Sequence, residues 1–325
     1  MLSRANARRR VRPEARVNTP SPRLERAARA FFAGHLGLIA FSTVAMLTVL
    51  NGPPGPWLAD EPNATIMRVG WKFSGPTYVL LGALAAISHA WGRLGARRAL
   101  MLFVVGSTVS LGAELLGTGT DFPFGEYRYS GLLGYRVAGL VPFPIPISWF
   151  YMIYGCLAIC GRLLVAADDN ASKWRWAAVA ALILVAWDVS MDPAMVKTAH
   201  WAWGNGEAFT NRGFPAIGVA FFSKDIFYGM PLSNWFGWYL IGTLIARLML
   251  ALVPPTRWAA LVSPSRFPAL LYAANGVMPI ALCFRDELWW AAVLGTFAMA
   301  VPVAFALRPT ATRLSTSASI TATTA

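Results

Sequence analysis

Eight long apolar stretches constrain this chain more than any other feature of its sequence. Each runs for about 17 to 22 residues, the length that a helix rising ~1.5 Å per residue needs to cross about 30 Å of hydrocarbon. The chain is 56% hydrophobic and only 13% charged, a balance that soluble domains rarely show. We therefore predict an all-α, multi-pass helical bundle in the cell membrane. The predicted helices cover residues 30–50, 75–91, 99–116, 145–166, 174–191, 235–253, 267–284 and 288–307.

The remaining segments divide the chain into two tails and one membrane domain. Residues 1–28 are rich in Arg, and residues 309–325 are mostly Ser, Thr and Ala, so we expect both to be disordered. Residues 29–308 are expected to form a single transmembrane domain. Two long outer loops, 117–144 and 192–234, are rich in Gly, Pro and aromatic residues. We expect these loops to fold back onto the bundle as a lid.

The basic residues predict the orientation of the bundle. Of the 28 Lys and Arg residues, 20 lie in the amino-terminal tail, in three expected turns or after the last span. The positive-inside rule then puts both termini in the cytoplasm. The net charge of +13 is spread over alternate segments and forms no stripe among aromatic side chains. We therefore expect contact with membrane lipids and none with nucleic acid.

Glu114 is an unusual residue because it lies near the outer end of the third expected span. A carboxyl group in hydrocarbon is costly and is usually retained for function. Burial disfavours its ionised form, which suits a general acid. The alternative is a structural role, either a hydrogen bond between helices or a side chain reaching toward the interface.

A second pair of acids lies in the fifth expected span. Asp188 and Asp192 are four residues apart, which places them on one helix face at a depth similar to that of Glu114. Like charges crowded in a poorly solvated site do not all ionise, so a protonated acid and a carboxylate would coexist. The alternative is that the two aspartates terminate the helix, with Pro193 ending it and water satisfying both.

Several short motifs follow one another over residues 112–240. They are Glu-Leu-Leu-Gly at 114–117, Thr-Gly at 118–119, Pro-Phe-Gly-Glu-Tyr-Arg-Tyr at 123–129, Leu-Gly at 133–134, Val-Pro at 141–142, Ser-Trp at 148–149, Trp-Asp at 187–188, Asp-Pro at 192–193, Trp at 201 and 203, Tyr-Gly-Met-Pro at 228–231, Asn at 234 and Gly-Trp at 237–238. In order and spacing these motifs resemble those of the membrane carotenoid hydratase family, of the carotenoid 1,2-hydratase and bisanhydrobacterioruberin hydratase type, whereas the tails show no such match. One departure is the Thr120-Asp121 pair, which separates two motifs expected to lie closer together.

The resemblance implies addition of water to the terminal (1,2) double bond of an acyclic carotenoid, giving a tertiary alcohol with no metal or organic cofactor. Glu114 and Asp188 are the first candidates for acid and base, with Asp192 as their orienting partner. Other enzymes of carotenoid synthesis are possible partners. The candidate substrate-binding residues are Phe124, Tyr127, Tyr129, Trp201, Trp203, Tyr228, Asn234 and Trp235.

Three other functions stay open at this point. A membrane prenyltransferase would use the Asp188 and Asp192 pair to bind magnesium diphosphate, but no second aspartate-rich motif is present. A carotenoid cyclase would begin with the same protonation and add no water. A proton-coupled transporter would also use acids within the membrane, but no internal repeat supports one.

Overall fold

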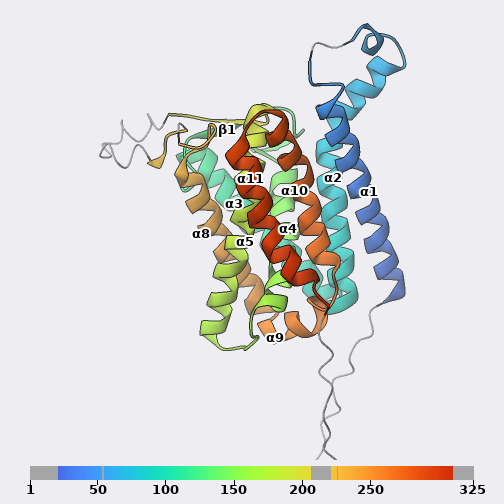
Figure 1. The fold of residues 1–325 in the computed structure, drawn as a ribbon. Coiled ribbons are helices and arrows are strands. Elements are labelled where there is room, and N and C mark those ends of the chain that lie inside the picture. Colours follow the sequence, from blue (N-terminus) through green and yellow to red (C-terminus); the bar gives the residue numbers. More distant parts are fainter. Residues whose placement is uncertain (1–20, 53–54, 206–220, 225, 310–325) are drawn as a thin grey trace, which may run out of the picture.

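Long helices make up most of the computed structural model, which describes residues 21–52, 55–205, 221–224 and 226–309. Each of the eight predicted ranges overlaps one helix, so the all-α prediction is confirmed (Figure 1). Short helical turns lie at Pro56–Leu58, Pro255–Arg257 (α9) and Trp258–Val262. The long helices are α1 (Pro22–Leu47), α2 (Asn63–Leu94), α3 (Ala96–Thr120), α4 (Pro144–Leu163), α5 (Asn170–Lys197), α8 (Leu232–Leu252), α10 (Phe267–Arg285) and α11 (Trp289–Leu307).

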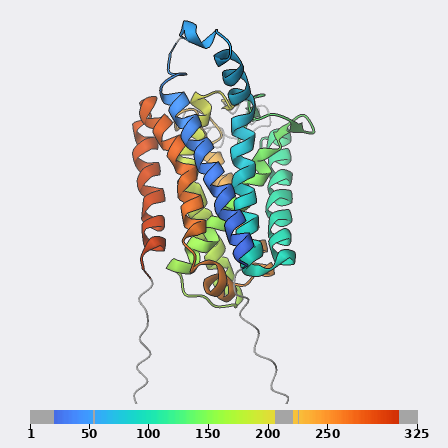
Figure 2. The same ribbon diagram turned by 90° about the vertical axis from the view of Figure 1, so that its right-hand side faces the viewer.

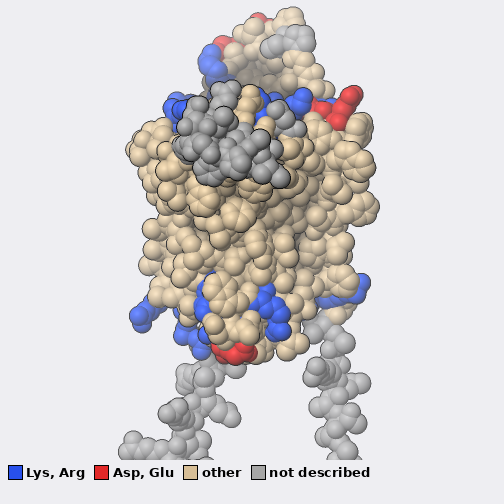
Figure 3. Space-filling model, turned by 90° about the vertical axis from the view of Figure 1, so that its left-hand side faces the viewer, with Lys and Arg blue, Asp and Glu red and all other residues tan. Residues whose placement is uncertain are grey.

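Seven of the described helices are long and apolar enough to cross a membrane. α2 is not among them, so the count of eight spans stays a prediction. On the face shown in Figure 3, charged side chains gather near the two ends of the bundle and leave an uncharged belt between them. Large apolar side chains such as Phe41, Leu182 and Phe297 are exposed around the bundle. This surface fits a hydrocarbon environment, in which only internally hydrogen-bonded segments are stable.

Two helices depart from their predicted ends. α1 begins at Pro22, inside the segment expected to be disordered up to residue 28, while residues 1–20 lie outside the described part. α5 continues through Pro193 to Lys197 instead of ending at the proline. The residues after Pro193 pack into the core, where Ala194 and Met195 are buried, and this packing holds the last turn. Asp192 therefore lies within the helix and not at its end.

The bundle is built around α4, most of whose side chains are buried. α3 and α5 pack on it, and α5 also runs along α8. The last turns of α3 and α5 and the first turns of α8 lie at the same end of the bundle (Figure 1). The start of α1 and the end of α11 lie at the opposite end (Figure 2). Which end faces the cytoplasm stays a prediction of the charge pattern.

Short strands join the two long loops. β1 (Tyr127–Tyr129) pairs in antiparallel register with β4 (Trp201–Trp203). β2 (Arg136–Val137) pairs with β3 (Val141–Pro142) within the first loop. Side chains alternate between the two faces of a strand, so the four aromatic residues of β1 and β4 share the face turned toward the helices. The loops expected over 117–144 and 192–234 are therefore partly ordered by a sheet, which the helix pattern did not predict.

The close contact between α4 and α10 depends on Gly155. A Cβ atom at this position would lie 3.0 Å from the Pro268 carbonyl oxygen and 3.1 Å from Tyr272 Cβ. We predict that Gly155→Ala destabilises the protein by about 1–3 kcal/mol, because backbone atoms at the contact must shift. Gly112→Ala is the control, since a Cβ there meets nothing within 4 Å. Thermal unfolding in detergent measures both, and equal midpoints would contradict this account of the contact.

Candidate active site

The Glu114 carboxyl group lies in the last two turns of α3 and is buried. The Tyr127 and Tyr129 hydroxyl groups donate hydrogen bonds to Glu114 Oε2, at 2.5 Å and 2.8 Å. The Trp149 indole N–H, from α4, donates to Oε1 at 3.2 Å. Both carboxyl oxygens therefore have donors from outside α3, and the carboxyl group is fixed in position.

The two tyrosines of β1 keep their hydroxyl protons and therefore act as hydrogen-bond donors to Glu114. Burial raises the pKa of Tyr127 and of Tyr129 well above the usual value of 10, and the nearby Glu114 charge raises both further. Both hydroxyl groups therefore keep their protons at neutral and moderately alkaline pH. Gly117 makes room for this arrangement, because a Cβ on it would meet Tyr127 Oη at 2.9 Å.

The second acidic cluster joins α5 to α8. Asp188 and Asp192 are both buried, and their carboxyl groups are within hydrogen-bonding reach of each other. The Asn234 side-chain amide, at the start of α8, donates to Asp188 Oδ2 at 3.0 Å and also to Asp192 Oδ2. Trp201 and Asp192 line the same cavity. Asp188 Oδ1 is buried and has no hydrogen-bond partner among the described residues.

A cavity of about 70 Å³ separates the two acidic clusters. Glu114 and Asp192 both line it, whereas Asp188, one turn earlier on α5, does not. The volume is about five times the minimum that one water molecule needs. Most of the wall is apolar or aromatic, and Asn234 and Asn275 are its two amide side chains among the described residues. A small apolar group and a water molecule would thus both have room beside the two carboxyl groups.

Aromatic rings enclose this cavity on several sides. Trp149 and Trp238 stack with their centroids 4.3 Å apart, and Trp187 meets Trp238 edge-on at 5.7 Å. On the loop side, the Tyr127 ring lies 4.9 Å from the Trp203 ring. The Trp203 indole N–H is buried and has no hydrogen-bond partner within the described segments. It is therefore available to a ligand or a water molecule in the cavity.

Most of the residues predicted from sequence meet at this cavity. Tyr228 and Trp235 do not line it. Instead the Tyr228 hydroxyl accepts a hydrogen bond from the Trp290 backbone N–H at 3.2 Å, and the Trp235 ring packs against Phe227. The predicted residues that line the cavity are Glu114, Asp192, Phe124, Tyr127, Tyr129, Trp201, Trp203 and Asn234.

Sequence reasoning missed several residues of the cavity wall. Trp149, Trp187 and Trp238 stood within the matched motifs but gave no sign of facing a cavity. Tyr151 and Asn275 lie in apolar stretches, and a polar side chain within a span was the available signal. The Tyr151 hydroxyl donates to Asn275 Oδ1 at 3.1 Å, so the two form one polar spot in the wall.

The comparisons with known proteins agree with the motifs. The family model described as carotenoid biosynthesis protein matches residues 74–302, which is more than half of the chain. The chain belongs to the carotenoid biosynthesis protein family. The matched range holds every candidate site residue, and the family resemblance predicted from the motifs is confirmed.

One relative of this family member has a named activity. Over 152 residues the chain is 29% identical to a protein named bisanhydrobacterioruberin hydratase from Haloarcula japonica. The match covers 47% of this chain and 45% of that relative, so the chain spans about half the length of the relative that it matches. No solved structure matches this family member.

We predict that Asn234→Leu destabilises the protein. Leucine removes the amide that donates to both aspartates, and leaving a buried acceptor without its donor costs about 1–3 kcal/mol. The control is Leu232→Ala, because Leu232 lies on the same helix and is exposed. The measurement is thermal unfolding of the purified protein. A midpoint for Asn234→Leu that equals that of the control would show that the amide does not hold the pair.

Proposed function

We propose that this protein is a carotenoid hydratase, which adds water to the terminal (1,2) double bond of an acyclic carotenoid and forms a tertiary alcohol. The observation that carries the proposal is the placement of Glu114 and Asp192 on the wall of one apolar cavity within a membrane bundle. An alkene is uncharged and lipid-soluble, so it partitions into such a cavity from the bilayer. The hydratase name of the relative supports the same reaction.

Asp192 is the proposed acid. It lines the cavity, whereas Asp188 does not and shares the Asn234 amide with it. Two adjacent buried carboxyl groups share one proton because ionising both would place two negative charges side by side, so Asp192 holds a proton that it can donate. After the transfer, the Asn234 amide still donates to both carboxylates. Asp192 transfers its proton to the carbon of the terminal double bond that bears a hydrogen. The positive charge is left on the other carbon of that bond, which is more substituted, so the cation is tertiary. The sequence favoured Asp188 for direct chemistry, and the cavity favours Asp192, with Asp188 as its positioning partner.

Glu114 is the proposed base. Its two oxygens accept three hydrogen bonds from side chains, and hydrogen bonds of this kind favour the carboxylate. Water held beside Glu114 bonds through its oxygen to the cationic carbon and releases a proton to the carboxylate. Proton transfer from Glu114 back to Asp192, directly or through water, then resets the site. The sum of these steps is one alkene plus one water giving one alcohol.

The aromatic wall has two roles in this proposal. Ring faces attract a nearby cation, by about 0.5–2 kcal/mol for each ring, and Trp149, Trp238 and Trp203 line the cavity. The same rings exclude bulk water. The water that captures the cation is therefore the one held beside Glu114. An apolar wall also accepts the methyl groups of the carotenoid end.

We predict that Glu114→Gln and Asp192→Asn each reduce hydration by a factor of about 100 or more, since a general acid or base typically contributes ~10²–10⁴. Asp188→Asn should have a smaller effect, because Asp188 acts through Asp192. The measurement is expression in a lycopene-producing host with analysis of pigment mass, in which each hydration adds the mass of one water.

Asp121→Asn is the matched control for these variants. Asp121 ends α3 with a positive φ of 67°, a conformation that asparagine also tolerates, and it does not line the cavity. It should keep wild-type activity. If the host that expresses the wild-type protein makes unchanged pigment, the hydratase function is refuted. If it makes an isomer of unchanged mass, the protein is a cyclase. Full activity of both Glu114→Gln and Asp192→Asn would refute the site while leaving the function in place.

A further inference from the structure

A second cavity adjoins the one that holds the acids. Its volume is about 60 Å³, and it lies between the α1–α2 pair, the first loop, α5 and α10. The two cavities share four lining residues, so they adjoin at these side chains. The shared residues are Tyr78, Leu133, Met195 and Met278.

A third cavity adjoins the second and lies nearer to the surface of the bundle. It has a volume of about 50 Å³ and lies between the end of α1 and the first half of α2. It shares Ser42, Met46, Trp71 and Ser74 with the second cavity. At its rim, Phe41 and Ile66 are 49% and 55% exposed. The series therefore leads from the acids to an apolar surface of the bundle.

Helices α1 and α2 are joined near the start of α1 and lie farther apart near its end. Near the start of α1, Arg93 on α2 pairs with Glu25 at 2.8 Å. Midway, the His35 imidazole hydrogen-bonds to the Tyr78 carbonyl at 2.7 Å, and Gly82 allows the His35 ring to pack against α2. Toward the end of α1 the two helices diverge (Figure 2), and the third cavity lies between them.

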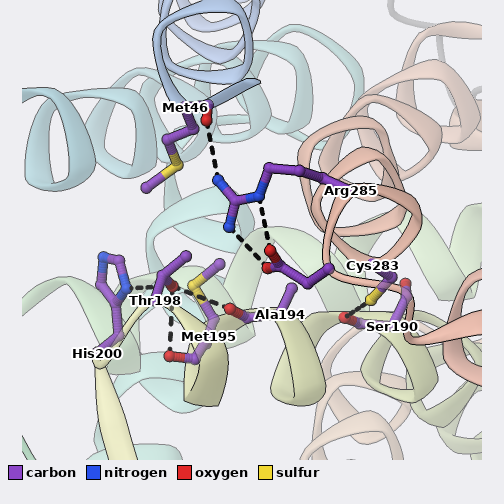
Figure 4. A network of polar contacts seen from close by, with 9 residues as sticks. Met46, Ser190, Ala194, Met195, Thr198, His200, Cys283 and Arg285 are labelled. Atoms are coloured by element: carbon purple, nitrogen blue, oxygen red, sulfur yellow. Dashed lines mark hydrogen bonds and ion pairs between the residues drawn. The ribbon is translucent and has the colours of Figure 1, made fainter. Parts of the chain in front are cut away.

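The far end of α1 is fastened to α10. Arg285 donates to the Met46 carbonyl at 2.9 Å while it pairs with Asp286 at 2.6 Å (Figure 4). This hydrogen bond holds α1 against the bundle on one side of the gap. α1 is therefore attached to α2 near its start and to α10 near its end, and the mouth of the third cavity lies between α1 and α2.

The walls of the two outer cavities carry no charged side chain among the described residues. Methionine and leucine are the most frequent residues in these walls. His200 lines the second cavity, and burial lowers its pKa to about 4, so it is neutral at physiological pH. Its Nδ1 atom is engaged by the Thr198 hydroxyl at 2.8 Å (Figure 4). An uncharged wall rich in methionine suits a long, stiff hydrocarbon.

We propose that the three cavities form one passage for the polyene chain of the substrate, which enters from the lipid between α1 and α2. This inference rests on the proposed function for the identity of the occupant. The cavity at the acids has room for an end group, and a carotenoid continues as a long conjugated chain that must leave it. The two adjoining cavities give that chain its route, and the mouth lets the far end stay in the bilayer. Only one end of the carotenoid reaches the acids at a time.

Cysteine labelling tests the passage without relying on activity. The three native cysteines are buried, so Ser74→Cys supplies the reactive thiol at the junction of the two outer cavities. We expect a bound acyclic carotenoid to slow maleimide labelling about tenfold when it is present at about ten times its Kd. Gly37→Cys is the control, because Gly37 lies on the outer face of α1 with nothing within 4 Å, and its labelling should not change.

Activity with two substrates gives the second test. Ser42→Phe places a bulky ring in the passage and should lower kcat/KM for a full-length acyclic carotenoid on the order of tenfold or more. A short acyclic terpene with the same end group does not extend into the passage, and its kcat/KM should change little. Gly37→Phe should leave both substrates unaffected.

The outcomes separate the passage from the proposed function. A wild-type protein that hydrates carotenoid, together with unprotected Ser74→Cys and equal losses for both substrates in Ser42→Phe, would overturn the passage alone. A wild-type protein that hydrates neither substrate but whose Ser74→Cys is protected by the carotenoid would overturn the hydratase function and support the passage. Protection combined with a selective loss on the long substrate supports both.

Discussion

The hydrogen bonds to the Glu114 carboxyl group are the interaction on which the site depends. In a membrane bundle a buried carboxyl group has little water, so its hydrogen-bond partners must come from the protein. Two of these donors are tyrosines of β1, which lies in the first loop, and the third is Trp149 of α4. Satisfying this one side chain therefore fixes the position of the loop relative to α3 and α4.

The β1–β4 pairing extends that constraint to the second loop. Tyr127 is opposite Trp203 and Tyr129 is opposite Trp201. The hydrogen bonds that fix β1 at Glu114 therefore also fix the two tryptophans of β4. Trp201 in turn lines the same cavity as Asp192 of α5. The two acidic clusters are thus linked through a small sheet as well as through the packing of helices. A site that needs two acids at a fixed separation benefits from this rigidity.

The helices and the depth of the acids were predictable because both follow from local rules. A run of apolar residues sets a span, and a rise of ~1.5 Å per residue sets how far along it each residue lies. This reasoning placed Glu114, Asp188 and Asp192 near one end of the bundle, as the structure does. It failed at Pro193, because tertiary packing of the residues beyond the proline outweighs its local preference to end a helix. It also missed the sheet, although the alternation of large and other residues at 127–129 and 201–203 is a strand pattern.

The sequence by itself determined a helical membrane bundle, its family and a set of acids at a common depth. Only the tertiary structure decided which acid faces the cavity, since Asp188 and Asp192 share a helix face and differ by a single turn. It also excluded Tyr228 and Trp235 from the cavity wall and brought in Tyr151 and Asn275. The physical reason is that a helix pattern gives the direction of a side chain around its own axis, whereas the position and tilt of the neighbouring helices decide what that side chain meets.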